Sequence, residues 1–522
     1  MVGVAAGVRR TAWWRGRIRT ARDAVFDYPG SLLTCLLGGY LIARIAVLRS
    51  STLKVWPDAF SYAYRDSPLW DRGPLVSFTG HAPRLWGVPL LYALFHNDWR
   101  RVEAQWAIST VAWALLACAL WTCLRGTAAK AVASGAVLSF ALLTLVTEWD
   151  FTIMSESLSI SLGVVVVACF LLWLRTGARI ALVALTAAAF YWTFVRAELR
   201  LFVVVLGAVL VFLAWRRRDL RRWAVGAAAA LAVAVGWCTA IMPNVLGTFS
   251  GYTATHLSAN SDVLMFRLGN TWGINITIYG DPRLQHVYED ELGMPKCPAA
   301  AEYARTRPKD FFGLLDRFNS CPELHAWADR NGDAPVSFAL AAPDQAARVV
   351  WNVAPRAFGG IDNYGLYGDA KRFFPKRIDR LMFHPSRKGL AALFGSLLLA
   401  LVAAWATGAF RRRRLLTVTA VVLTITALVS EVAGVLYLDI EASRYAVQEN
   451  FAIRIALLML AVTALDAFVE RRHERRAQRS APPEPAVTEP EVAVPTPRHP
   501  ADPSSLPELA GAGTSGGAQG AS

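Results

Sequence analysis

Four short clusters of ionisable residues stand out in a chain of 522 residues of which only 18% are charged. The first contains Asp58, which directly follows Pro57 and precedes Tyr62. Proline fixes its own φ and pushes the residue before it into an extended conformation, so we expect the chain to turn just ahead of Asp58. A carboxylate shielded there by aromatic neighbours could act as a general base with a raised pKa. The structural alternative is a solvated loop carboxylate or a helix N-cap.

The second cluster brings Glu148, Asp150 and Glu156 together within nine residues. Three carboxylates at this spacing are unusual in such a weakly charged chain, which makes the segment a candidate site. The structural alternative is that Ser155 caps a helix and that Glu156 lies in its first turn, where the helix dipole favours a negative charge.

The third and fourth clusters contain arginine. Arg196 begins the sequence Arg-Ala-Glu-Leu-Arg, and Arg444 is followed by Tyr445. A guanidinium group is a planar fork that can hold a phosphate with two hydrogen bonds, and a tyrosine beside it can add a third. Both clusters could therefore bind a lipid phosphate. The alternative for each is an interfacial arginine that extends towards anionic headgroups.

Two further arginines are weaker candidates. Arg84 follows Pro83 and precedes an apolar stretch, Leu85–Phe95, that is too short to cross a membrane and is typical of a helix lying in the interface. Arg44 lies inside the first long apolar stretch, about a turn from its end, so that its side chain could extend to the interface.

The motifs of nucleotide-dependent enzymes are absent from the sequence. It contains no G-x-x-x-x-G-K-[ST], no strand-associated G-x-G-x-x-G, no D-x-D and no H-E-x-x-H. An enzyme of this kind would therefore receive its energy-rich donor from the membrane. The net charge of +15 does not indicate a nucleic-acid partner, because the arginines occur in short runs between apolar stretches instead of covering one face.

The elements that must position these residues are membrane helices. Apolar residues make up 55% of the chain, which is too many for a soluble protein. A helix of about 20 apolar residues spans the ~30 Å hydrocarbon core of a bilayer. We therefore expect an all-α polytopic membrane protein with ten spans, at about 30–49, 103–124, 131–147, 156–174, 179–195, 201–215, 224–242, 389–409, 415–437 and 450–469.

The arginine runs predict the orientation of these spans, because Lys and Arg favour short cytoplasmic segments. Six arginines precede the first span, which places the N-terminus in the cytoplasm. If the chain crosses the membrane ten times from there, all of the remaining cytoplasmic connections are basic as well. We expect a protein of the cytoplasmic (inner) membrane with both termini in the cytoplasm. The segments 50–102 and 243–388 and the turn Glu148–Asp150 would then lie outside.

The long external segment is expected to fold as a mainly helical cap, because residues 299–318 and 342–354 show helical periodicity. Cys297 and Cys321 are the only cysteines outside the predicted spans. A disulfide between them would contribute about 3 kcal/mol, and two free thiols are the alternative. The predicted parts are a basic cytoplasmic N-terminus (1–29), a seven-helix membrane module (30–242) with its first external loop (50–102), the cap (243–388), three C-terminal membrane helices (389–470) and a basic, then disordered Pro-rich cytoplasmic tail (471–522).

In this order and on this side of the membrane, the clusters resemble the GT-C superfamily of integral-membrane glycosyltransferases, which use polyprenyl-phosphate sugars. The superfamily includes protein O-mannosyltransferases, the aminoarabinose transferase of lipid A and actinobacterial arabinofuranosyltransferases. The resemblance is one of pattern and covers about 30–215 and 438–469. It departs from the family at Ala197, where a proline is common, and in its ten spans, since relatives often have eleven to thirteen. The matching positions are Asp58 in the first external loop, Glu156 at the start of the fourth helix, Arg196 after the fifth, and Arg444-Tyr445 before a late helix.

The resemblance implies an inverting transfer of a hexosyl or pentosyl group from a polyprenyl-phosphate donor to a hydroxyl of a cell-envelope acceptor, which could be a glycan, a lipid or a protein. It indicates no certain cofactor and leaves a divalent metal open, because these carboxylates lack a ligand signature. The implied roles are general base for Asp58, orientation of acceptor or sugar for Asp150, Glu156 and Tyr62, and binding of the donor phosphate for Arg84, Arg196, Arg444 and Tyr445.

Two other functions compete with this one. A lipid-linked glycan transporter or flippase should have charged residues along a path through the middle of the membrane. A non-catalytic envelope-assembly protein would use the cap and the tail to bind partners, and Asp58 would then be dispensable.

Overall fold

In the computed structural model, the described residues form helices joined by turns and loops, with an isolated parallel bridge between Lys54 and Thr152. Asp58 lies outside the described residues, as does most of the predicted tail. The described residues are 29–55, 59–64, 74–216, 220–257, 278–279, 281–307, 317, 321–331, 334–359, 372–437 and 442–480.

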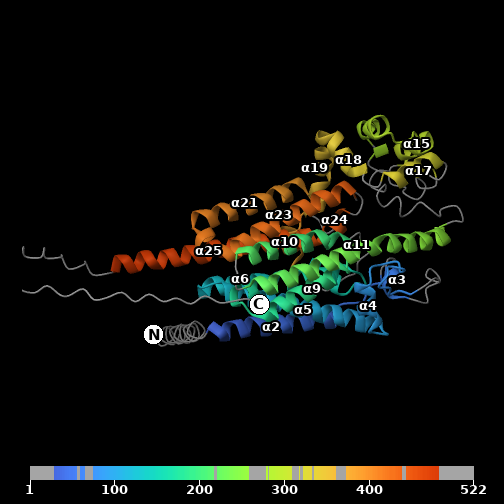
Figure 1. The fold of residues 1–522 in the computed structure, drawn as a ribbon. Coiled ribbons are helices and arrows are strands. Elements are labelled where there is room, and N and C mark those ends of the chain that lie inside the picture. Colours follow the sequence, from blue (N-terminus) through green and yellow to red (C-terminus); the bar gives the residue numbers. More distant parts are fainter. Residues whose placement is uncertain are drawn as a thin grey trace, which may run out of the picture. The chain divides into compact units, whose positions relative to one another are not determined.

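Eight of the described helices are long and apolar enough to cross a membrane. They run alongside one another in the bundle of Figure 1. The expectation of an all-helical membrane protein is therefore confirmed for the described part of the chain. These helices are α2 (Pro29–Ser50), α5 (Asp98–Cys123), α8 (Glu156–Thr176), α10 (Arg200–Arg216), α11 (Arg221–Leu257), α21 (Arg387–Ala406), α23 (Arg414–Tyr437) and α25 (Val447–Ser480).

The other two predicted spans differ from simple membrane helices. The span expected at 131–147 is broken into α6 (Thr127–Phe140) and α7 (Thr144–Asp150), which meet at an angle of 55°. At the break, the backbone N–H of Thr144 donates to Oδ1 of Asp379 at 3.1 Å, so a carboxylate satisfies a helix-terminal donor. The span expected at 179–195 is α9 (Arg179–Thr193), whose 15 residues rise only about 23 Å. The described residues thus hold eight spans, or nine with the bent pair.

Two helices continue beyond the ends that hydropathy predicts. Helix α11 was expected to end at residue 242 but passes Pro243 and ends at Leu257. A proline removes one backbone donor and can bend a helix without ending it. Helix α25 likewise continues past residue 469 through the basic segment to Ser480. In both cases the helix is longer than its apolar stretch, because helical hydrogen bonds do not require an apolar side chain.

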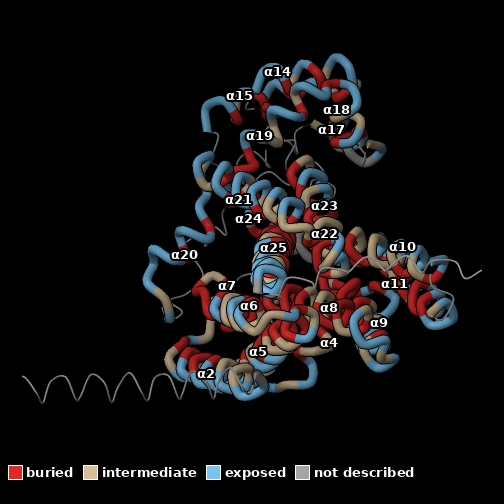
Figure 2. The backbone as a smooth tube through the Cα atoms, turned by 90° about the vertical axis from the view of Figure 1, so that its left-hand side faces the viewer, coloured by how far each residue is buried: buried red, intermediate tan, exposed pale blue. Residues whose placement is uncertain are grey.

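The bundle has its core where α5, α6, α8 and α25 meet, and Figure 2 shows buried residues concentrated there. Small residues such as Ala112 and Ala117 of α5 and Ala168 of α8 are fully buried and allow close helix approach. Large apolar side chains such as Ile42 and Trp405 are instead exposed on the outside of the bundle, as expected for surfaces that face lipid.

The segment between α11 and α21 contains short helices with an apolar core of their own, which includes Tyr288, Trp327 and Phe338. Several of these helices begin with a proline, which fits the first helical position because its missing N–H would have no partner there. Cys297 and Cys321 form a disulfide with a Cα–Cα distance of 6.1 Å. The elements are α14 (Pro282–His286), η3 (Val287–Glu291), α15 (Pro298–Thr306), α17 (Pro322–Arg330), α18 (Ala334–Ala341), α19 (Pro343–Gly359) and α20 (Lys376–Met382).

Helix α19 connects this helical segment to the membrane bundle. It packs against α21, α23 and the short helix α24 (Ala442–Tyr445). The side chain of Asn450 on α25 donates to the carbonyl of Ala357, and Arg454 donates to the carbonyl of Phe358 at 3.1 Å. The C-terminal end of α19 is therefore held beside the segment that carries Arg444.

Candidate functional site

Glu156 is the centre of a cluster of predicted site residues. It is the first residue of α8, and its side chain is 0% exposed. Nε of Arg444 donates a hydrogen bond to Oε1 of Glu156 at 2.8 Å, and Nη1 of Arg196 lies 3.1 Å from the same oxygen. A buried carboxylate without a partner would be costly, so the two cations explain why Glu156 can be ionised here. The structure thus joins three residues that the sequence placed in three separate clusters.

Arg196 lies between α9 and the 3₁₀ turn η2 (Ala197–Leu199), in an extended backbone conformation. Its Nε donates to Oε1 of Glu198 at 2.5 Å, so its guanidinium group contacts two carboxylates. Burial by itself favours loss of the proton, but Glu198 and Glu156 hold the pKa of Arg196 above its ordinary value. Arg196 is therefore a permanent cation in a buried position.

Tyr445 provides an aromatic surface for both arginines. The centre of its ring lies 5.1 Å from the guanidinium carbon of Arg196 and 5.9 Å from that of Arg444. Such cation–π contacts are attractive and limit the orientations of both side chains. The predicted Arg444-Tyr445 pair and the predicted Arg196 thus belong to one cluster.

The first loop adds Tyr62 and Arg84 to this cluster. Nε of Arg84 donates to Oγ of Ser61 at 2.8 Å, and its guanidinium carbon lies 4.8 Å from the centre of the Tyr62 ring. The hydroxyl of Tyr62 donates to Oγ of Ser155 at 3.3 Å. The hydroxyl of Ser155 in turn donates to Oε2 of Glu156 at 3.3 Å. A continuous chain of contacts therefore runs from Arg84 to Glu156. We call Tyr62, Arg84, Glu156, Arg196, Arg444 and Tyr445 the arginine–tyrosine cluster.

Backbone contacts position the elements that carry the cluster. The N–H of Lys54 donates to the carbonyl of Phe151 at 3.0 Å, and the N–H of Ile153 donates to the carbonyl of Lys54 at 3.1 Å. The start of the first loop is thereby paired with the segment that leads into α8. The N–H of Gly87, in α4 (Gly87–Ala93), donates to the carbonyl of Phe194 at 3.0 Å, two residues before Arg196.

Helix α4 coincides with the stretch that was expected to lie in the membrane interface. Its residues Val88 and Tyr92 are buried in the protein, and Trp86 directly before it stacks on Phe194 with ring centres 4.4 Å apart. A Cβ atom at Gly87 would lie only 2.6 Å from the carbonyl oxygen of Phe194, so glycine permits this close approach. The helix is thus packed against protein on most of its surface.

Asp150 lies outside the arginine–tyrosine cluster. Its Oδ2 accepts from Arg44 at 2.6 Å, and its Oδ1 accepts from Ser157 at 2.6 Å. Arg44 is fully buried and also donates to Thr110, so it does not extend to the interface as the sequence suggested. The physical reason is that a buried charge is stable where ion pairing and hydrogen bonds replace its water. The pair therefore has a structural explanation without a substrate.

A pair of buried carboxylates near the cluster was not predicted. Glu431 of α23 and Glu449 of α25 are both almost completely buried, and Oγ of Ser430 donates to Oε1 of Glu449 at 2.5 Å. An ionised carboxylate is costly at such buried positions, and Arg196 of the cluster is close enough to Glu449 to interact with it electrostatically. The signal available in the sequence was one carboxylate inside the predicted span 415–437 and another directly before the predicted span 450–469.

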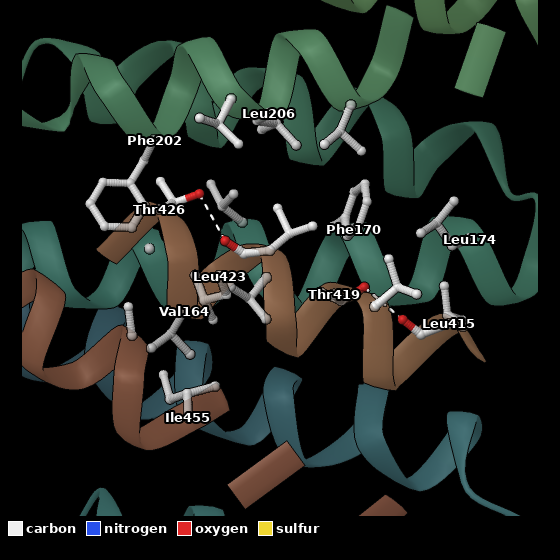
Figure 3. Close-up of a pocket in the computed structure, with 18 of the residues that line it drawn as sticks. Val164, Phe170, Leu174, Phe202, Leu206, Leu415, Thr419, Leu423, Thr426 and Ile455 are labelled. Carbon is white, nitrogen blue, oxygen red and sulfur yellow. Dashed lines mark hydrogen bonds between the residues drawn. The ribbon is translucent and has the colours of Figure 1, made fainter. Parts of the chain in front are cut away.

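A long apolar groove lies between α10 and α23, with a volume of about 870 Å³. Figure 3 shows Phe202 and Leu206 on one side, Leu415 and Leu423 on the other, and side chains of α8 on the floor. The hydroxyls of Thr419 and Thr426 donate to carbonyls of their own helix, at 2.8 and 2.9 Å. The groove is therefore suited to a hydrocarbon chain and poorly suited to a glycan.

Comparisons with protein-family models, with curated proteins and with solved structures find no match for this chain. Within the described ranges, no three His, Cys, Asp or Glu side chains come together in a way that could hold a metal ion. The chemical interpretation of the arginine–tyrosine cluster therefore rests on the geometry of this chain.

Proposed function

We propose that this protein is an integral-membrane glycosyltransferase of the GT-C type. It transfers a sugar from a polyprenyl-phosphate donor to a hydroxyl of a cell-envelope acceptor at the outer face of the cytoplasmic membrane. The observation that carries the proposal is the convergence of Arg196 and Arg444 on the buried carboxylate of Glu156. This contact brings together the two arginine clusters that were predicted to bind phosphate, and Tyr62 brings the first loop to the same place.

In this proposal the donor phosphate binds beside Arg84, Arg196 and Arg444. Guanidinium groups present several N–H donors in a planar arrangement that matches phosphate oxygens. Glu156 is fully buried and contacts the two arginines, so it is a positioning residue and not a group that orients acceptor or sugar hydroxyls. Asp150 is likewise left out of the proposed binding site, because Arg44 and Ser157 occupy both of its oxygens.

The proposed reaction is a single displacement at the anomeric carbon. Asp58 takes the proton of the acceptor hydroxyl, whose oxygen bonds to the anomeric carbon on the face opposite the phosphate. The bond between that carbon and the phosphate oxygen breaks, and polyprenyl monophosphate leaves with the electron pair. Negative charge grows on the phosphate as this bond breaks, so fixed cations nearby lower the barrier. The configuration at the anomeric carbon is inverted.

The chain neighbours of Asp58 support its assignment as the base. Lys54 is paired with Phe151 and Ile153, directly before α8. On the other side of Asp58, the side chain of Ala59 is fully buried and Tyr62 contacts Ser155. The segment that contains Asp58 thus begins and ends at residues held near the first turn of α8.

The decisive experiment measures release of polyprenyl phosphate by the purified protein, with a panel of polyprenyl-phosphate sugars and cell-envelope acceptors. Asp58→Asn should reduce turnover by ~100-fold or more, as loss of a general base predicts. The matched control is Asp344→Asn, at an exposed position in the first turn of α19, which should behave as wild type. Equal turnover in Asp58→Asn and wild type would remove Asp58 from the mechanism.

The proposed side of the membrane can be tested separately by cysteine labelling. In a background without the free cysteines, Val55→Cys lies three residues before Asp58 at a position that is 45% exposed. An impermeant maleimide should label it in intact cells. Thr176→Cys, an exposed position at the opposite end of α8, should be labelled only after permeabilisation. The reverse pattern would contradict an active site on the outer face.

A further inference from the structure

The α10–α23 groove extends well beyond the depth of one lipid leaflet. On α10 its lining runs from Phe202 to Arg216, and on α23 it runs from Thr426 to Arg414. These fourteen and twelve residue steps correspond to about 21 and 18 Å along the helix axes, against roughly 15 Å for half of the hydrocarbon core. The groove therefore has the length for an extended hydrocarbon chain.

The groove is also open along its side. Phe212 of α10 and Val418 of α23 both line it and are 52% and 44% exposed. In a membrane, the neighbours of such a surface are lipid chains, which can enter sideways without passing through water. An elongated apolar groove that opens towards lipid fits a chain that enters from the bilayer.

Charge distinguishes the two ends of the groove. Among the described residues that line it, the charged ones are Arg216 and Arg414. Figure 3 shows Thr426 beside Phe202 at one end of the groove and Leu415 at the other, so Arg216 and Arg414 belong to the end opposite Phe202. They are the last residue of α10 and the first residue of α23, and both are exposed. The other end, near Gln448, is lined by uncharged residues. An occupant with an anionic head would therefore place its head between the two arginines.

We propose that the α10–α23 groove is a binding site for an anionic phospholipid, with an acyl chain in the groove and the phosphate between Arg216 and Arg414. This site is separate from the arginine–tyrosine cluster. Arg216 lies at the opposite end of α10 from Arg200, which follows Arg196 by four residues. Arg414 lies at the opposite end of α23 from Tyr437, the end that leads to Arg444. In the predicted topology it faces the cytoplasmic leaflet, where short basic segments and anionic lipids attract each other. The inference does not depend on the proposed transfer reaction.

The test compares lipid binding in detergent by native mass spectrometry, with phosphatidylglycerol and phosphatidylcholine of identical acyl chains as probes. Wild type should prefer phosphatidylglycerol by roughly tenfold, since each arginine near the headgroup attracts its charge. Arg216→Gln/Arg414→Gln should bring the two lipids to equal occupancy. The matched control, Arg221→Gln/Arg411→Gln, removes two exposed arginines from the same end that do not line the groove, and should keep the preference.

A second variant tests the position of the acyl chain. Val418→Trp fills the groove and should abolish retention of both lipids, whereas Val429→Trp, also on α23 and exposed but outside the groove, should not. Lipid that remains bound to Val418→Trp, or a phosphatidylglycerol preference that survives Arg216→Gln/Arg414→Gln, would overturn the proposal. Recovery of an isoprenoid phosphate from the groove would also overturn it and would assign the groove to the donor.

Discussion

Nε of Arg444 donates a hydrogen bond to Oε1 of Glu156 at 2.8 Å, although the two residues are 288 positions apart in the sequence. Both side chains are almost completely inaccessible to solvent. The bond ties α24, directly before the last membrane helix, to the first turn of α8. Arg196 contacts the same carboxylate, so Glu156 sets the separation of two cations.

Glu156→Gln keeps the shape of the side chain and removes its charge. Two buried arginines then lose a counter-ion, and breaking a buried pair costs about 3–5 kcal/mol. We expect a clearly lower melting temperature in detergent and weaker binding of polyprenyl phosphate. The control is Glu103→Gln, whose partner Arg100 is largely exposed and whose ion pair should contribute less than about 1 kcal/mol. Equal stability of the two variants would contradict the role of Glu156.

Arg44→Met and Asp150→Leu should each destabilise the protein by about 3–5 kcal/mol, because each leaves the opposite charge buried without its partner. The double variant should recover much of this loss, since two apolar side chains can replace a buried ion pair. A double-mutant cycle of thermal unfolding measures the coupling. If the stable double variant also releases polyprenyl phosphate, Asp150 has no role in substrate binding. A double variant that is stable but inactive would show that Asp150 or Arg44 is needed for the reaction.

Glu431→Gln should stabilise the protein. Glu431 and Glu449 are both almost completely buried, and an ionised carboxylate is costly in such surroundings, whereas an amide at position 431 has no charge to bury. The same substitution at Glu470 of α25 removes an ion pair with Arg413 at 3.1 Å and should not stabilise. Melting temperatures of the two variants at neutral pH provide the comparison. A lower melting temperature for Glu431→Gln would show that its charge has a partner.

Gly87→Ala should displace α4 from the end of α9. The new Cβ would lie 2.6 Å from the carbonyl oxygen of Phe194, and this backbone atom cannot move as a side-chain tip would. Overpacking of this kind costs about 1–3 kcal/mol. Because Arg84 precedes α4 and Arg196 follows Phe194, we also expect weaker binding of polyprenyl phosphate.

Gly135→Ala is the matched control for this variant. Gly135 lies inside α6, and nothing would contact a Cβ atom there within 4 Å. Alanine in a helix interior is favoured over glycine by up to about 1 kcal/mol, so stability should be unchanged or higher. Wild-type stability and binding in Gly87→Ala would show that the contact with Phe194 does not position the cluster.

The sequence was sufficient to predict the helices, because the requirement for internally bonded backbone and apolar side chains in lipid acts on each segment locally. Each of the ten predicted stretches falls on a described helix or on the bent pair of α6 and α7. The ends of α11 and α25 were not predictable in this way, since a helix can continue through residues that are not apolar. The predicted base, Asp58, lies outside the described residues and stays a prediction.

The choice of partners was decided only by the tertiary structure. Glu156 and Asp150 looked alike in the sequence, as carboxylates in one short segment. The packing of α8 turns Glu156 towards Arg196 and Arg444, whereas Asp150 at the end of α7 meets Arg44 of α2. The physical reason is that an ion pair needs two groups within a few ångströms, and such distances between separate helices depend on their rotation and approach. Composition and local spacing therefore determined which residues are candidates for chemistry, and helix packing determined which of them meet.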